Sequence, residues 1–166
     1  MITIISGTNR PGSNTIKVAE QYLQLLSDKG IPANFISLEG LNVQERNLDI
    51  VKLERDYLIP SDKFIFISPE YNGSIPGVLK SLIDSTDIQK VWWGKKALLT
   101  GVSTGRAGNL RGMEHLTSIL HYVKVVVHPN KLPISIVDKL LNGVGVITDK
   151  GTLDAIDVQL NEFLQF

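Results

Sequence analysis

The chain of 166 residues carries 17 basic and 17 acidic residues and contains no cysteine. A single hydrophobic core commonly reaches this length, so we expect one domain over residues 1–166. The balanced charge does not indicate nucleic acid or an anionic membrane as a partner, and it favours a small-molecule ligand. Without cysteine, disulfides, thiolate catalysis and cysteine-ligated metals are excluded. The start has no leader-like features and no apolar run is long enough for a membrane span, which predicts a cytoplasmic protein.

Short apolar runs alternate with amphipathic segments along the chain. The pattern predicts strands over 2–6, 33–38, 64–67, 96–102 and 123–127, and helices over 13–27, 47–58, 78–87, 110–122 and 152–166. The stretch 129–142 is left unassigned, because Pro133 and Gly143 bracket its one short apolar segment. Five alternations of strand and helix predict an α/β three-layer sandwich with a five-stranded parallel sheet and right-handed crossovers. The natural strand order is 2-1-3-4-5, the flavodoxin-like arrangement.

The loop after the first strand, 7–15, reads Gly-Thr-Asn-Arg-Pro-Gly-Ser-Asn-Thr and leads into a helix. Backbone N–H groups at a helix start, together with hydroxyls and Arg10, predict a site for a single phosphate. The loop has the glycine spacing of a nucleoside-triphosphate P-loop, but Ser13 stands where that motif needs lysine, and the dinucleotide fingerprint is absent. The alternative interpretation is that Ser13 only caps the helix and Arg10 is solvated.

Two further loops follow the third and fourth strands, and both should open at the carboxyl edge of the sheet, where such folds bind ligands. The first, 68–77, contains two glycines and two prolines around Tyr71 and Asn72, and the second, 103–108, consists mostly of small residues. In the predicted strand order, the loops at Gly7 and Ser68 line the same crevice. Each loop taken alone is also compatible with a plain turn that begins a helix.

The sequences 7–15 and 69–80 resemble those of the NAD(P)H-dependent FMN reductase family, which has the flavodoxin-like fold and includes quinone, chromate and azo-dye reductases. The resemblance implies FMN and NAD(P)H as cofactors. It also implies a phosphate loop, a loop for the isoalloxazine ring and a loop at the far edge of the flavin. By this resemblance the expected cofactor-binding residues are Thr8, Arg10, Ser13, Asn14, Thr15, Pro69, Glu70, Tyr71, Asn72, Gly73, Ser103, Thr104, Gly105 and Arg106.

The resemblance predicts an oxidoreductase that passes hydride from nicotinamide through FMN to a small acceptor such as a quinone or free flavin. In such an enzyme the cofactor carries the chemistry, so we expect neither a catalytic side chain nor a metal site. The alternative is a flavodoxin-type electron-transfer protein, although the zero net charge argues against the acidic docking surface such proteins carry. A response-regulator-like domain is excluded because the first strand ends in Ser6-Gly7 rather than in aspartates.

Trp92 and Trp93 stand between the third helix and the fourth strand, in a polar context. Two adjacent tryptophans cannot both enter one core from a short connector, so at least one should be exposed or covered by a partner. Since the resemblance also implies dimers or tetramers, we expect a homodimer or homotetramer, with these residues near the ligand loops. The competing interpretation places one tryptophan under the fourth strand and the other harmlessly on the surface.

Overall fold

A computed structural model describes all residues, 1–166. Its sheet has the order β2-β1-β3-β4-β5, in which β1 spans Ile2–Ser6, β2 Ala33–Ser37, β3 Lys63–Pro69, β4 Lys96–Val102 and β5 Val126–Val127, while a further short strand, β6 (Leu132–Ile134), also pairs with β4. All these pairings are parallel. The predicted fold class and strand order are confirmed.

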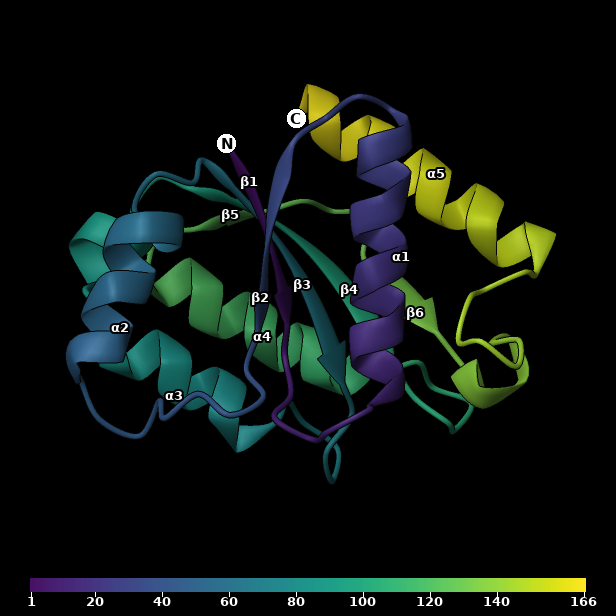
Figure 1. The fold of residues 1–166 in the computed structure, drawn as a ribbon, viewed down its shortest axis with the longest axis horizontal. Coiled ribbons are helices and arrows are strands. Elements are labelled where there is room, and N and C mark those ends of the chain that lie inside the picture. Colours follow the sequence, from purple (N-terminus) through teal and green to yellow (C-terminus); the bar gives the residue numbers. More distant parts are fainter.

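Helices cover both faces of the sheet (Figure 1). On one face lie α1 (Asn14–Asp28) and α5 (Lys150–Gln165), and on the other lie α2 (Leu48–Leu53), α3 (Gly77–Ser85) and α4 (Leu110–Tyr122). Each face of the sheet packs against its helices in a separate hydrophobic core, and successive strand residues point into opposite cores. Ile65 packs with the α1 and α5 side chains, while Phe64 and Phe66 pack with those of α2, α3 and α4. This alternation is the period-two geometry of a strand that is buried on both faces. No helix is long and apolar enough to span a membrane.

Two short strands, β5 and β6, pair with β4 where a single fifth strand over 123–127 was predicted, so that prediction is corrected. Helix α4 ends in a Schellman arrangement, in which the N–H groups of Lys124 and Val125 donate to the carbonyls of His121 and Leu120, and Lys124 takes φ 60°. Residues 123–125 therefore complete the helix end, and β5 begins only at Val126. The chain then breaks from the sheet and returns as β6, in the stretch that the sequence left unassigned.

A buried polar network supports this break. The Tyr22 hydroxyl lies 2.8 Å from the Thr100 hydroxyl and donates to Gln159 Oε1 at 2.7 Å, and all three side chains are fully buried. The Gln159 amide in turn donates to the carbonyls of Leu99 and Asn130. Gln159, from helix α5, thus gives a hydrogen-bond donor to the Leu99 carbonyl of β4, at the point where the chain breaks from the sheet. Burial in this network raises the pKa of the Tyr22 hydroxyl.

The helix boundaries differ from the sequence predictions mainly at their caps. The second helix is shorter than predicted, because Asn47 caps α2 and a π-helical turn, Glu54–Leu58, follows it. Helix α5 begins earlier than predicted, because the Asp149 carboxylate accepts the Thr152 N–H at 2.8 Å. Ser13 is confirmed as the cap of α1, since its Oγ accepts the Ile16 N–H at 3.2 Å.

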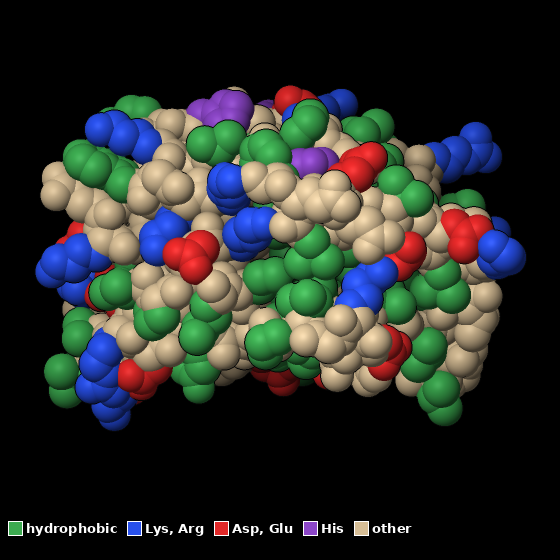
Figure 2. Space-filling model, turned by 90° about the horizontal axis from the view of Figure 1, so that it is seen from above, with side chains coloured by type: hydrophobic (Ala, Val, Ile, Leu, Met, Phe, Trp, Pro, Cys, Tyr) green, Lys and Arg blue, Asp and Glu red, His purple; other side chains and the backbone are tan.

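The termini lie together at the amino ends of the strands, the face shown in Figure 2, where basic side chains stand among hydrophobic ones. Lys63, the first residue of β3, donates from Nζ to the carbonyls of Phe163 and Leu164 in the last turn of α5. Lys96, the first residue of β4, donates from Nζ to a backbone oxygen of Phe166, the residue after α5. These cations lie where the macrodipole of α5 is negative. Their side chains therefore fasten the last helix to the sheet.

The two tryptophans separate as the sequence suggested. Trp92 is fully buried, with its ring 5.0 Å from that of Phe64 and its Nε1 donating to the Thr86 hydroxyl. Trp93 is 41% exposed, and Lys124 Nζ lies 3.6 Å from its ring centroid. Trp93 lies just before β4, at the amino end of the sheet. The expectation that this pair adjoins the ligand loops is wrong, because those loops leave the opposite ends of the strands.

Candidate active site

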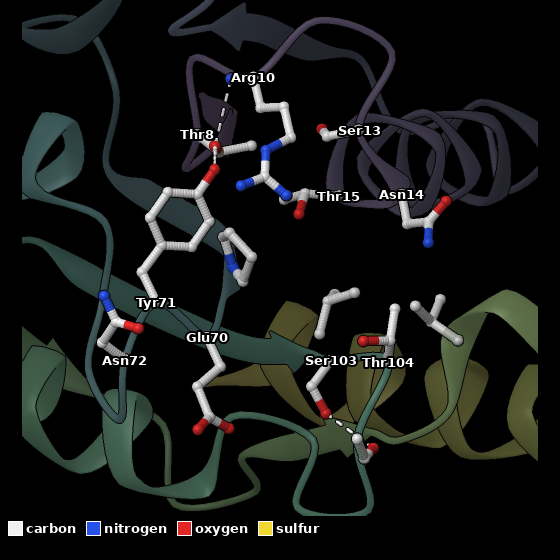
Figure 3. Close-up of a pocket in the computed structure, with 14 residues that line it drawn as sticks. Thr8, Arg10, Ser13, Asn14, Thr15, Glu70, Tyr71, Asn72, Ser103 and Thr104 are labelled. Carbon is white, nitrogen blue, oxygen red and sulfur yellow. Dashed lines mark hydrogen bonds between the residues drawn. The ribbon is translucent and has the colours of Figure 1, made fainter.

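Three loops at the carboxyl ends of β1, β3 and β4 surround a cavity of about 430 Å³ (Figure 3). This volume is within the usual range for small-molecule and cofactor sites. The lining contains all but two of the residues predicted from the sequence: Thr8, Arg10, Ser13, Asn14, Thr15, Pro69, Glu70, Tyr71, Asn72, Ser103, Thr104 and Gly105. Gly73 and Arg106 lie outside this lining, and Val102 and Val137 complete it.

The first loop is held close to β3 by Gly7. Its N–H donates to the Ile67 carbonyl at 2.8 Å, and a Cβ at this position would lie 3.0 Å from the same oxygen. Only glycine therefore fits without displacing the end of β3. Thr8 follows, and its hydroxyl lies 2.9 Å from the Tyr71 hydroxyl and accepts the Arg10 N–H. This contact joins the first loop to the second.

Beyond Thr8 the loop presents an electropositive wall. The N–H groups of Asn14 and Thr15, in the first turn of α1, donate to no group of the chain, and that turn contains no acidic residue. The Arg10 guanidinium carbon lies 5.1 Å from the Tyr71 ring centroid, and Arg10 forms no ion pair. Free N–H groups at a positive helix end beside an unpaired guanidinium form a site for an anion.

The second loop is a small hairpin at the end of β3. The N–H of Tyr71 donates to the Ser74 carbonyl at 2.9 Å, and the reverse bond measures 3.1 Å. Between them Asn72 and Gly73 take φ values of 50° and 79°, as a type I′ turn requires and as an Asn-Gly pair favours. Gly73 is thus explained by its backbone conformation, while Tyr71 and Asn72 line the cavity.

The third loop is closed by its own serine and tied to the segment after β6. Ser103 Oγ donates to the Gly105 carbonyl at 2.9 Å and accepts the Gly108 N–H at 3.0 Å. The N–H groups of Ile136 and Val137 donate to the carbonyls of Gly105 and Ser103, which brings Val137 into the cavity wall. The N–H groups of Thr104 and Gly105 have no partner in the chain, so they remain available to a ligand.

Val102 and Val137 were missed by sequence reasoning. Val102 ends the apolar run of β4, so nothing in the sequence separates it from core residues of the same strand such as Leu98 and Leu99. Val137 lies in the unassigned stretch. No group of His, Asp and Glu side chains in the structure could hold a metal ion.

A protein-family model described as NADPH-dependent FMN reductase matches residues 1–138. The chain belongs to this family. It is therefore an oxidoreductase of the NAD(P)H-dependent FMN reductase and quinone reductase type, which confirms the resemblance seen in the loop sequences. The match covers all three loops of the cavity.

Curated relatives carry consistent names. The chain is 29% identical to an NAD(P)H-dependent FMN reductase of Pseudomonas aeruginosa, over 94% of this chain and 89% of the relative. It is 27% identical to a 2-hydroxy-1,4-benzoquinone reductase of a Burkholderia species, over 75% and 72% of the two chains. It is also 34% identical to a quinone reductase of Escherichia coli, over 64% and 58%.

Solved structures share the fold. A flavoenzyme NAD(P)H:acceptor oxidoreductase from Paracoccus denitrificans superposes with a TM-score of 0.80 at 24% identity, covering 99% of this chain and 94% of that one. The apo form of an NADH:FMN oxidoreductase gives 0.71 at 26% identity, covering 95% and 87%. A flavodoxin from Megasphaera elsdenii gives 0.54 at 16% identity, covering 82% and 86%. The first and the last of these likenesses, at 24% and 16% identity, show the fold alone.

Proposed function

We propose that this enzyme binds FMN in the cavity and transfers reducing equivalents from NAD(P)H to a small acceptor such as a quinone or free flavin. The observation that carries the proposal is the composition of the cavity. One end presents free N–H groups and an unpaired guanidinium, and the other is enclosed by two loops at the carboxyl edge of the sheet. This polarity fits a ligand with one anionic tail and one flat heterocyclic end.

The anionic end fits a terminal phosphate. Arg10 and the N–H groups of Asn14 and Thr15 are the donors, and the Thr15 hydroxyl stands beside them (Figure 3). Because the loop lacks the P-loop lysine and the dinucleotide fingerprint, a single phosphate fits better than a triphosphate or a pyrophosphate. The donors therefore favour FMN over FAD and over riboflavin.

The other end fits the ring system. Pro69, Tyr71 and Asn72 stand on one side, and the third loop, with Val102 and Val137, forms another part of the wall. The unpaired N–H groups of Thr104 and Gly105 can donate to the carbonyl edge of a heterocycle. The apolar valines favour a flat ring and limit the access of water to that part of the site.

When bound, FMN supplies the redox chemistry by accepting a hydride from the nicotinamide and passing the electrons on. The chain's own residues bind and orient. Arg10 holds the phosphate end, and Thr8 fixes the Tyr71 hydroxyl so that the tyrosine ring keeps its place in the wall. No side chain needs to act as a nucleophile or as a general base. The exposed Glu70 carboxylate forms no ion pair within the chain and is assigned no step of the reaction.

The test begins with the purified protein, incubated with FMN and freed of excess by gel filtration. We expect retained flavin bands in the visible spectrum that bleach with NAD(P)H and return when a quinone is added. Steady-state rates should follow a ping-pong pattern, because nicotinamide and acceptor would use the same open face in turn. Intersecting kinetics with free FMN consumed would instead indicate a flavin reductase. Retained FMN that NAD(P)H does not bleach would favour the electron-transfer alternative.

A further inference from the structure

The side chain of Asn109, the residue before α4, reaches across to the root of the loop that carries Tyr71. We propose that Asn109 is a positioning residue, which fixes the 69–72 wall of the cavity and thereby sets the affinity and the electronic environment of the flavin ring. The inference rests on the proposed binding of FMN. It adds a residue outside the cavity lining to those that determine how the ring is held.

The contacts of Asn109 end on backbone atoms of β3. Its Nδ2 donates to the Ser68 carbonyl at 2.9 Å and to the Pro69 carbonyl at 3.0 Å, with the Ser68 hydroxyl at 3.4 Å. Asn109 is fully buried, so water does not compete for these bonds. Pro69 lines the cavity and precedes Glu70, whose N–H donates to the Val102 carbonyl at 3.1 Å. The root of the second loop is thus held from α4 and from β4.

Three unfavourable features accompany these bonds. Asn109 takes φ 61°, in the left-handed region that asparagine tolerates better than most residues but that only glycine adopts freely, and its Oδ1 is buried without a partner. Gly112 must also lack a side chain, because a Cβ there would lie 2.0 Å from that Oδ1. Glycine at position 109 would adopt the same backbone without strain and leave no orphan oxygen. The hydrogen bonds made by Nδ2 are therefore what asparagine contributes at position 109 and glycine would not.

Helix α4 contacts the tip of the same loop as well. His115 Nδ1 lies 2.8 Å from the Ser74 hydroxyl, and Arg111 Nη1 lies 3.0 Å from the position that a Cβ on Gly73 would occupy. Arg111 and His115 are one helical repeat apart, so they stand on one face of α4. The tip contacts are exposed, whereas the root contact is buried. Asn109 is therefore the contact that solvent cannot replace.

The principal variant is Asn109→Gly, because glycine keeps the backbone conformation and removes only the amide. The dissociation constants of FMN and riboflavin should both rise about tenfold, the loss expected for a buried hydrogen-bond pair. Equal effects on the two ligands place the change at the ring rather than at the phosphate. The midpoint potential and the visible spectrum of the bound flavin should shift too, which a loss of fold stability alone does not produce.

The matched control is Lys124→Gly at the opposite end of α4. Lys124 has φ 60°, so this change relieves the same backbone strain without touching the loop. A second variant, Gly112→Ala, leaves Asn109 in place and displaces its amide with a methyl group, although alanine is the better helix former. We expect Lys124→Gly to retain wild-type affinities and potential, and Gly112→Ala to weaken both flavins.

Wild-type affinities and potential in both Asn109→Gly and Gly112→Ala would overturn the positioning role. Gly112→Ala keeps that test available if Asn109→Gly does not fold. Loss of riboflavin and FMN binding in Lys124→Gly to the same extent would also overturn it, because the effect would then belong to the helix as a whole. Failure of the wild type to bind FMN would instead reject the proposed function, so the two failures are distinguishable.

Discussion

Arg10 is the residue whose replacement best separates the phosphate end of the site from the ring end. Its guanidinium forms no ion pair within the chain and lies beside the free N–H groups of α1. In Arg10→Ala, FMN binding should weaken by about 1.5–3 kcal/mol, the worth of a hydrogen bond to a charged group, while riboflavin binding should scarcely change. Fluorescence titration of both ligands measures this.

Arg55→Ala is the matched control, because Arg55 is an exposed arginine that pairs with Asp56 outside the cavity. It should leave both affinities unchanged. Equal losses for FMN and riboflavin in Arg10→Ala would contradict the assignment of the phosphate site.

Tyr22→Phe tests the buried network behind β4. The change deletes a hydroxyl that bonds Thr100 and Gln159, and should lower the free energy of unfolding by about 1–3 kcal/mol. Urea denaturation measures the loss, and Tyr122→Phe, at a residue 86% exposed, serves as the control. An unchanged unfolding midpoint in Tyr22→Phe would show that the network contributes nothing.

The same residue predicts a dependence on alkaline pH. Burial raises the pKa of Tyr22 above its unfolded value of about 10, so the neutral hydroxyl favours the folded state. This contribution is fully present below pH ~10 and is lost as the pH rises further. Wild-type stability should therefore fall more steeply than that of Tyr22→Phe above this pH.

Among the elements, the helix ends show what sequence can and cannot predict. Gly30 and Lys124 occupy equivalent positions in two Schellman motifs, each at positive φ. Glycine is the usual residue there, so the end of α1 was predictable. A lysine carries no such signal, and the valines after it favour a strand, so the strand after α4 was predicted to begin too early, at 123 rather than at Val126.

The strand β6 was also not predicted, because its sequence carries a signal against a strand. Pro133 lies within β6, where a proline argues against a strand in a sequence-based prediction. The Ser103 N–H donates to the Ile134 carbonyl, so the backbone polar groups of Ile134 face β4. Successive residues of a strand face opposite sides, so the backbone polar groups of Pro133 face away from β4. The missing N–H therefore falls on the outer edge, where no ladder bond is lost. That position depends on tertiary pairing, which local sequence does not record.

Asp149→Asn tests the cap of α5. Hydrogen bonds from the Thr152 side chain and backbone lower the pKa of the Asp149 carboxyl, so its charged form stabilises the fold. A depressed folded-state pKa gives stability that is present above the unfolded value of about 4 and is lost as pH falls through the folded value. Asparagine caps equally well but does not titrate.

Thermal unfolding from pH 7 to pH 2 measures this effect. Asp149→Ala should melt below the wild type at pH 7 and converge with it in acid, while Asp149→Asn should stay close to the wild type at neutral pH. A constant gap between Asp149→Ala and the wild type at every pH would contradict a role for the carboxylate charge.

At the scale of the whole molecule, the strand order explains why the candidate site was largely predictable. The chain reverses direction between β1 and β3, so the loops that follow them meet without any long-range signal in the sequence. The contacts between those loops were not predictable. The hydroxyl pair of Thr8 and Tyr71, the bridge from Asn109 and the position of Val137 depend on distances between elements far apart in the chain.

We also propose that the protein forms a homodimer or homotetramer, with Trp93 in a contact between copies. Its ring is 41% exposed, and tryptophan is enriched at protein–protein interfaces relative to the rest of the surface. Trp93→Ala should shift the mass measured by light scattering toward the monomer. Because Trp93 lies at the opposite edge of the sheet from the cavity, FMN affinity should stay unchanged in that variant. A wild-type monomer with full activity at micromolar concentration would reject the proposal.

The unlike surroundings of the two tryptophans also give the molecule two internal optical reporters. Trp92 is sealed among the rings of Phe64 and Phe66, whereas Trp93 meets solvent and the Lys124 ammonium group. A soluble quencher should therefore extinguish the emission of Trp93 and spare that of Trp92. Indole emission overlaps flavin absorption, so energy transfer to bound FMN should lower the Trp92 emission that the quencher leaves. FMN binding can therefore be followed without a label, from a residue buried in one core of the sheet.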